Sequence, residues 1–410
     1  MTGNVLEHVD EKALVELASD LIRIPSFKGN ETPVAEWLAE YFSARGYVVD
    51  LQEVDPGRFQ AIATLKGTGD GPSLMFNGHT DIDPLAYGWT GDPFTPRLEG
   101  NRLYGAGVWN MKGGVASMIC AAEAVRRSGT KLKGDLVIAC VVGELEGGVG
   151  TKALLDSGFR TDAAVVTEPV GAANVVTTHA GAMEMAVSTI GYSEHVTTRE
   201  HPIDAIRKMM KVISALEHVK FRHQPRPDLP ALPYLNVNCI IGGRGRDHDL
   251  QGAYFTSDYC TAIVDVRFLP GQTSETVVDD VRNVLDALQA EDPEFRYEIE
   301  VPPPPKFKAL RVMEPTDVPT DADIVQSVVR HYEQVAGKPP NAIGTHLPPS
   351  YTVNDTCHLW RAGIPCVLYG PAGSPGTPAK PDNAIFIDEM VLATKVLALT
   401  ALDFCEVTTE

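Results

Sequence analysis

The stretch Ser73-Leu-Met-Phe-Asn-Gly-His-Thr-Asp-Ile-Asp-Pro84 begins as an apolar run and ends in polar side chains. The run predicts a buried strand that leads directly into His79 and Asp81. The same design recurs at residues 136–142 before Glu144, at 163–166 before Glu168, and at 365–369 before a Gly-Pro loop. In mostly parallel sheets, ligands bind beyond the carboxyl ends of the strands. The four loops therefore predict one site.

The remaining patterns divide the chain into two kinds of segment. Apolar residues at helical spacing and short β-type runs predict helices at 10–27, 32–46, 111–127, 324–335 and 390–404, and strands at 48–54 and 60–65. Between them lies a smaller α+β pattern, with strands at 182–190 and 261–268 and helices at 202–216 and 274–288. Four prolines at 302–305 mark the return to the first pattern.

The prediction is thus an α/β protein of two domains, which suits a chain of 410 residues. Residues 1–179 and 302–410 form the larger domain, around a mixed, mostly parallel sheet. Residues 180–301 form an α+β domain inserted into it. A charged, glycine-rich stretch within the insertion, residues 242–249, is expected to be an exposed loop and not an anion site.

The composition of the chain argues against several functional classes. The formal charge of −19 argues against binding to nucleic acid or to anionic membranes, because both need clustered cations. An acidic N-terminus without an apolar core, and the absence of a run long enough to span a bilayer, predict a cytoplasmic protein. The 7 cysteines are scattered, so we expect reduced thiols rather than disulfides or a Cys-x-x-Cys zinc site.

A series of motifs carries a resemblance that covers nearly the whole chain. The series is Gly78-His-Thr-Asp81, Trp89-Thr-Gly-Asp-Pro-Phe94, Leu103-Tyr-Gly-Ala-Gly107, Met111-Lys-Gly-Gly114, Glu144 with Gly147-Gly148, Glu168-Pro169 and Asp265-Val-Arg267. It resembles the dinuclear-zinc peptidase and deacylase family, which includes acetylornithine deacetylase, succinyl-diaminopimelate desuccinylase, aminoacylase and glutamate carboxypeptidase. The resemblance implies a catalytic domain with an inserted lid and dimerisation domain, and hence a homodimer.

The family's metal ligands are mostly replaced. The resemblance implies two zinc ions held by a His, a bridging Asp, a Glu, an Asp or Glu, and a second His. His79 and Glu168 match two of these positions, whereas Asn110, Leu145 and Ala379 stand at the other three. A neutral amide cannot offset two dications, and alkyl side chains have no lone pair to offer. We therefore expect no metal or other cofactor.

One alternative keeps a metal. A single zinc or other divalent ion could bind His79 and Glu168 if Glu146 supplied a third ligand. Glu146 would lie on the same side as Glu144 if the strand continued. His346 and His358 are weaker candidates, because lone histidines are more often ordinary hydrogen-bonded groups.

The residues that survive imply an acid and base set. By resemblance, Glu144 is the general base, Asp81 orients His79, and His195 on the lid reaches the partner's site to stabilise an oxyanion. Asn110, Glu168, Trp109 and Cys357 are the predicted substrate contacts. Cys357 replaces an Arg that usually holds a substrate carboxylate, so a small polar molecule is expected in place of the usual N-acyl amino acid.

Three hypotheses follow. The favoured one is a metal-independent enzyme that uses Glu144 for amide or ester hydrolysis, or for a proton-transfer elimination or isomerisation. The second is a hydrolase of C–N amide bonds with one residual metal ion. The third is a non-catalytic dimeric binding protein, favoured by the lost ligands but disfavoured by the retained Glu144, Asp81 and His195.

Overall fold

The computed structural model describes residues 3–198, 202–250, 254–373 and 381–408. The chain divides into two compact units. The first comprises Met1–Thr178, Thr316–Pro349 and Asn354–Glu410, and the second comprises His179–Pro315 and Ser350–Val353. The second unit continues past the four prolines because the following residues bind its sheet: Met313 and Ala182 exchange backbone hydrogen bonds, and the Leu310 N–H donates to Glu184.

The first unit is built on an eight-stranded sheet with the order β1-β2-β6-β3-β7-β16-β8-β15. The strands are β1 (Val48–Asp55), β2 (Arg58–Leu65), β3 (Leu74–His79), β6 (Leu136–Val141), β7 (Ala163–Val166), β8 (Asn174–Val176), β15 (Ala342–Gly344) and β16 (Cys366–Leu368). The four strands predicted to carry the site are neighbours, β6-β3-β7-β16, and pair in parallel. Antiparallel pairs at β1, β2 and β8 make the sheet mixed, which confirms the predicted fold class.

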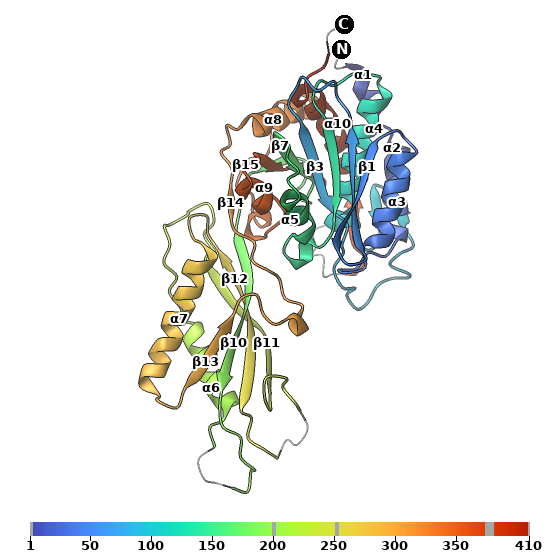
Figure 1. Ribbon diagram of the computed structural model, residues 1–410. Helices are drawn as coiled ribbons and strands as arrows, with labels where there is room; N and C mark the ends of the chain where they lie inside the picture. The colour runs from blue at the N-terminus through green and yellow to red at the C-terminus, as the bar shows by residue number, and fades with distance from the viewer. Residues whose placement is uncertain (1–2, 199–201, 251–253, 374–380, 409–410) are drawn as a thin grey trace. The chain divides into compact units, whose positions relative to one another are not determined.

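Helices cover both faces of this sheet. They are α1 (Gly3–Leu6), α2 (Glu11–Arg23), α3 (Thr32–Ser43), α4 (Gly113–Arg127), α5 (Val149–Asp156), α8 (Asp323–Ala336), α9 (Thr356–Arg361) and α10 (Ile387–Phe404). Every residue of β3 is buried, as in strands covered on both faces. A Cβ at Gly78 would lie 3.0 Å from Val115 of α4, whereas Asn77 donates to Thr151 of α5. Thus α4 and α5 lie on opposite sides of β3 (Figure 1).

Short elements complete the first unit. A three-stranded sheet contains β4 (Arg97–Glu99), β5 (Arg102–Tyr104) and β17 (Ala384–Phe386). Single turns are η1 (Val108–Lys112), η2 (Glu144–Glu146) and η4 (Pro349–Tyr351), and β9 (Thr178–His179) and β14 (Thr316–Asp317) are two-residue strands. The helix predicted to begin at Met111 starts at Gly113, because Asn110 and Met111 have non-helical backbone angles.

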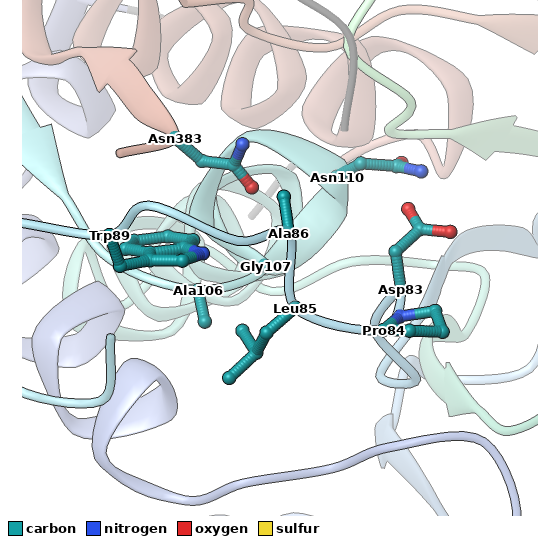
Figure 2. Close-up of a pocket in the computed structure, with 9 residues that line it drawn as sticks. All are labelled: Asp83, Pro84, Leu85, Ala86, Trp89, Ala106, Gly107, Asn110 and Asn383. Atoms are coloured by element: carbon teal, nitrogen blue, oxygen red, sulfur yellow. The ribbon is translucent and has the colours of Figure 1, made fainter. Parts of the chain in front are cut away.

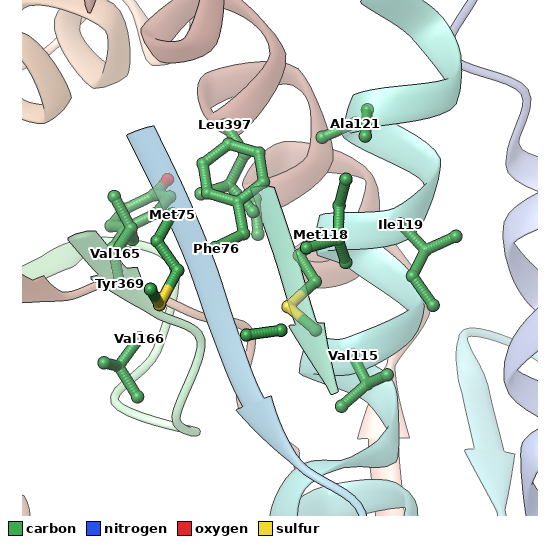
Figure 3. Packing of buried hydrophobic residues seen from close by; sticks show 14 of the residues in the cluster. Met75, Phe76, Val115, Met118, Ile119, Ala121, Val165, Val166, Tyr369 and Leu397 are labelled. Atoms are coloured by element: carbon green, nitrogen blue, oxygen red, sulfur yellow. The ribbon is translucent and has the colours of Figure 1, made fainter. Parts of the chain in front are cut away.

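Phe76 lies at the centre of the first unit's core. It is fully buried on β3 and belongs to one cluster with Val115 and Met118 of α4 and Leu397 of α10 (Figure 3). Truncating it removes a buried ring and leaves a cavity, so Phe76→Ala should lower the free energy of unfolding by about 3–5 kcal/mol. Urea unfolding followed by circular dichroism measures this loss. The exposed Leu98→Ala is the matched control and should change stability by less than about 0.5 kcal/mol.

The second unit is a four-stranded antiparallel sheet with two helices. The strand order is β11 (Tyr234–Gly243), β12 (Tyr259–Phe268), β10 (Gly181–Ile190) and β13 (Arg296–Glu300). Helices α6 (Ala205–Leu216) and α7 (Ser274–Glu291) share one apolar cluster with alternate residues of the central strands, and η3 (Pro305–Phe307) follows β13. Among the helices that the structure describes, none has the length and apolar character needed to cross a bilayer.

Candidate active site

The carboxyl ends of three adjacent strands bring the predicted acid and base groups together. His79 is the last residue of β3 and pairs in register with Val141, which ends β6 just before Glu144. Glu168 follows β7. The Gly-Pro loop after β16 packs at Gly370 against the backbone of Thr167 and Glu168.

His79 is almost completely buried, at 1% exposed, and both ring nitrogens face oxygens. Nδ1 lies 2.9 Å from the backbone oxygen of Asp81 and 3.5 Å from its carboxylate. Nε2 lies 3.2 Å from Oδ1 of Asn110 and 3.6 Å from Glu168. Burial alone would lower the pKa of His79, but Asp81, Glu168 and Glu144 outweigh it and raise that pKa well above the usual value. Both ring nitrogens face oxygen acceptors, and this arrangement favours the imidazolium, in which each nitrogen donates.

Asp81 links this ring to the Glu144 turn. Its two carboxylate oxygens accept the backbone N–H groups of Glu144 at 3.1 Å and Leu145 at 3.0 Å. Burial would raise the pKa of Asp81, but His79 and these two N–H groups lower it. Asp81 is therefore an ionised side chain that fixes both the imidazolium and the turn.

Three further carboxyl groups surround His79. Burial first, and then Glu168, Asp355 and Asp81, raise the pKa of Glu144 well above its ordinary range. Burial likewise raises the pKa of Glu168, and raises that of Asp355 to about 7. Asp355, just before α9, is 1% exposed, and its Oδ1 has no hydrogen-bond partner in the described part of the chain. Asp355 is not among the site residues predicted from the sequence.

Glycine is required where Asp355 approaches the Glu144 turn. Gly148 has φ of +68°, and a Cβ there would lie 2.6 Å from Oδ1 of Asp355 and 2.6 Å from Nε2 of His358. No side chain can occupy that space without moving both groups. Gly147 and Gly148 thus form the predicted tight turn between strand and helix.

A small pocket lies beside Asn110. It has a volume of about 10 Å³, room for one water molecule, and Asp83, Trp89, Ala106 and Asn110 are among its lining residues. Figure 2 shows the Asn110 amide and the Asp83 carboxylate on the same side of this pocket. The buried Nε1 of Trp89 donates to no other described residue. Trp109, a predicted substrate contact, precedes Asn110 and is half-buried. Its ring lies close to Gly373, where an added Cβ would be 2.9 Å from Cδ1 of Trp109.

The other predicted residues fall in different places. Cys357 is fully buried, and burial raises the pKa of its thiol well above the usual value. His195 belongs to the second unit, where its ring packs against Tyr254 and Phe255 and its Nδ1 lies 2.6 Å from Thr197. Ala379 lies outside the described residues.

Glu146, the third ligand of the single-metal alternative, is paired with another side chain in this structure. Residues 144–146 form the turn η2 and do not continue the strand. The Glu146 carboxylate accepts from Arg58 at 2.8 Å, and Arg58 is also paired with the buried Glu31. Nε2 of His358 donates to the backbone oxygen of Gly147, so it supports the turn. Burial lowers the pKa of His346.

Comparison with known proteins identifies the family. The profile of peptidase family M20/M25/M40 matches residues 75–403. The chain belongs to this family. It is 29% identical to the N-formyl-4-amino-5-aminomethyl-2-methylpyrimidine deformylase of Bacillus subtilis, with 98% of this chain and 96% of that protein covered. It is 30% identical to the acetylornithine deacetylase of Proteus mirabilis, with 68% and 73% covered.

The fold is also that of solved M20 structures. The YxeP protein of Bacillus subtilis, described as a dinuclear metal binding peptidase of the M20 family, superposes with a TM-score of 0.67 at 15% identity. That superposition covers 96% of this chain and 98% of the other. The family and its relatives make this protein a hydrolase on the M20 fold.

The donor groups at this site do not fit the pair of metal ions that the family implies. Asn110 offers a neutral amide oxygen where a bridging carboxylate is needed, and Leu145 offers no donor atom. Glu146 is held by Arg58. Across the described ranges, no three His, Cys, Asp or Glu side chains are arranged to hold one metal ion.

Proposed function

We propose that this M20 hydrolase cleaves the C–N amide bond of a small N-acylated amine without a metal pair, with Glu144 as the group that moves the proton. The observation that carries the proposal is the buried Glu144 carboxyl group, fixed through its backbone by Asp81 and lying within the electrostatic reach of the His79 imidazolium. A general base is most effective when its pKa lies near the working pH, which is the direction of the Glu144 shift.

The proton path can be written with these residues alone. The Glu144 carboxylate takes a proton from water, and the water oxygen attacks the acyl carbon. Because Nδ1 of His79 is held by Asp81, the Nε2–H, which faces Asn110 and Glu168, is the donor for the oxygen that gains negative charge. Glu144 then returns the proton to the nitrogen as the C–N bond breaks, releasing a carboxylic acid and an amine.

The choice of an N-acylated amine rests on two observations. The relatives reported above are a deformylase and a deacetylase. At this site, Asp83, Glu168 and Asp355 add carboxyl groups around a single imidazole, and such a surface disfavours an anionic substrate. Cys357 also lacks the charge needed to hold a substrate carboxylate. N-formyl and N-acetyl derivatives of small amines without a carboxylate are the substrates to screen.

We expect activity to be independent of metal. Protein purified without added metal should contain well under one zinc, manganese or cobalt ion per chain by elemental mass spectrometry, because the site lacks ligands for a tight complex. Chelators should leave its turnover of the screened amides unchanged. Turnover that stops with chelator and returns with a stoichiometric divalent ion would contradict the proposal and support the hydrolase with one metal at His79 and Glu168.

We further propose that the protein is a homodimer through the second unit, with His195 of each chain serving the site of its partner. His195→Ala should then lower kcat by about 10²-fold, as expected for loss of one oxyanion donor. Light scattering should give the mass of a dimer for the wild type and for this variant.

Mixing two inactive variants tests the shared site directly. A heterodimer of His195→Ala with Glu144→Gln has one site in which both residues are intact. Unfolding and refolding the two variants together should therefore recover about a quarter of the wild-type activity, since half of the dimers are mixed and half of their sites are complete. Activity no higher than that of the separate variants would show that each chain uses its own His195.

A further inference from the structure

A second cavity, of about 310 Å³, lies entirely within the second unit. Its wall includes Arg246, His248, Tyr259, Glu300, Lys306 and Phe307. The loop at residues 242–249, expected from the sequence to be exposed, carries His248 into the interior, where it is 4% exposed. The cavity is within the size range of small-molecule sites.

The floor of the cavity is the sheet face opposite the helices. Cys260, Ala262 and Val264 of β12 pack with α6 and α7. Because side chains alternate along a strand, Tyr259 and Thr261 point to the other face. Thr261 pairs in register with Ser188 of β10, and both are nearly fully buried although both are polar.

These polar groups form a directed hydrogen-bond chain. Nζ of Lys306 donates to the backbone oxygen of Arg246 at 2.5 Å and lies 3.1 Å from Nδ1 of His248. An ammonium can only donate, so Nδ1 accepts and the proton of the neutral ring is on Nε2. Nε2 then donates to Thr261 at 2.8 Å, and the Thr261 hydroxyl shares a hydrogen bond of 2.7 Å with that of Ser188.

The backbone strain and the buried polar groups around this cavity both cost stability, which indicates a function that requires them. His248 has φ of 56°, a left-handed conformation that non-glycine residues rarely adopt. Such strain persists where the surrounding structure enforces it, and it concentrates at ligand sites. Apolar side chains on this sheet face would avoid burying the polar Ser188 and Thr261 beside the buried His248. The strain and the polar lining both point to a ligand.

The charges on the wall indicate which ligand. Arg246 is bound to Glu298, which also accepts from Tyr259, and Asp247 is exposed to solvent. Lys306 uses two of its three N–H groups, and no described carboxylate contacts it. Glu300 makes only a long contact of 3.9 Å to Arg246 within the described part of the chain, so its carboxylate keeps acceptor positions.

One positive and one negative group are thus available beside an apolar wall made by Pro304, Pro305 and Phe307. We propose that this cavity binds a free α-amino acid with an apolar side chain. Its carboxylate contacts Lys306, its ammonium contacts Glu300, and its side chain packs on Phe307. This inference uses no residue of the catalytic site.

The test is calorimetric titration of the full-length protein with L-leucine and L-phenylalanine. At least one should bind saturably below about 10 mM. Two analogues of leucine, 4-methylpentanoate without the ammonium and 3-methylbutylamine without the carboxylate, should each bind at least about tenfold more weakly. Lys306→Met and Glu300→Gln should also weaken binding at least about tenfold. Lys211→Met, an exposed lysine on α6, is the control and should bind as the wild type does.

Several outcomes would overturn the inference. These are no saturable binding of either amino acid, binding of one analogue as tight as that of leucine, or unchanged binding in both cavity variants. Circular dichroism and thermal melting establish whether the variants fold. If a variant does not fold, the comparison of leucine with its two analogues on wild-type protein still tests the inference. Because the readout is binding, its result is independent of whether the proposed amide hydrolysis is found.

Discussion

Glu144→Gln should lower kcat of the amide hydrolysis by about 10³-fold, within the range that general acid–base groups contribute. Glutamine has nearly the same shape as glutamate, but it cannot accept and return a proton. The backbone N–H of residue 144 would still donate to Asp81, so the turn should keep its structure. Steady-state kinetics with the amide found in the substrate screen measures the loss, and KM should change little.

The same substitution two residues away provides a matched control. Glu146 lies in the same turn, but its carboxylate is held by Arg58. Glu146→Gln should therefore cost less than about tenfold in kcat and show its main effect as a modest loss of stability. Equal losses in both variants would mean that disturbance of the turn, and not proton transfer, explains the result. A Glu144→Gln enzyme with nearly full activity would remove Glu144 from the mechanism.

The central sheet could be predicted because its signal is local. Continuous apolar runs at β3, β6, β7 and β16 predicted buried parallel strands, and the structure makes them neighbours. β11 and β13 in the second unit were missed, because their residues are largely exposed or half-buried and leave no apolar run in the sequence. The end of the insertion was placed at the prolines, whereas tertiary hydrogen bonds from Leu310 and Met313 decide it.

The site was predictable only where residues follow strands. His79 ends β3, Asp81, Glu144 and Glu168 lie in the loops that follow strands, and Asp81 does contact the Glu144 turn. Asp355 comes from the start of α9, and the Arg58 partner of Glu146 lies 88 positions away in the chain. Periodicity contains no information about such distant pairs. The cavity at His248 was missed for the same reason, since Lys306 and Thr261 reach it from separate segments.

Asp81→Asn is expected to lower kcat by about 10²-fold, as for other residues that orient a functional group, and to destabilise the protein as well. An amide has one accepting oxygen, so only one of the N–H groups of Glu144 and Leu145 can keep its hydrogen bond. The second backbone N–H would then face the NH₂ group of the asparagine and lose its acceptor. A buried donor without a partner should lower the free energy of unfolding by about 1–3 kcal/mol.

The pH profile of this variant separates orientation from simple loss of stability. In the wild type, the charge of Asp81 helps to raise the pKa of His79, so the imidazolium persists above the usual pH. Activity that needs the imidazolium is lost as the pH rises through that raised pKa. Without the charge of Asp81 the pKa of His79 falls, so the alkaline limb of kcat/KM should move to lower pH.

Asp83→Asn is the control. It removes a charge that contacts neither N–H group of the turn, and should move the alkaline limb less. If the profiles of Asp81→Asn and the wild type differ in height but not in position, Asp81 does not control the charge of His79.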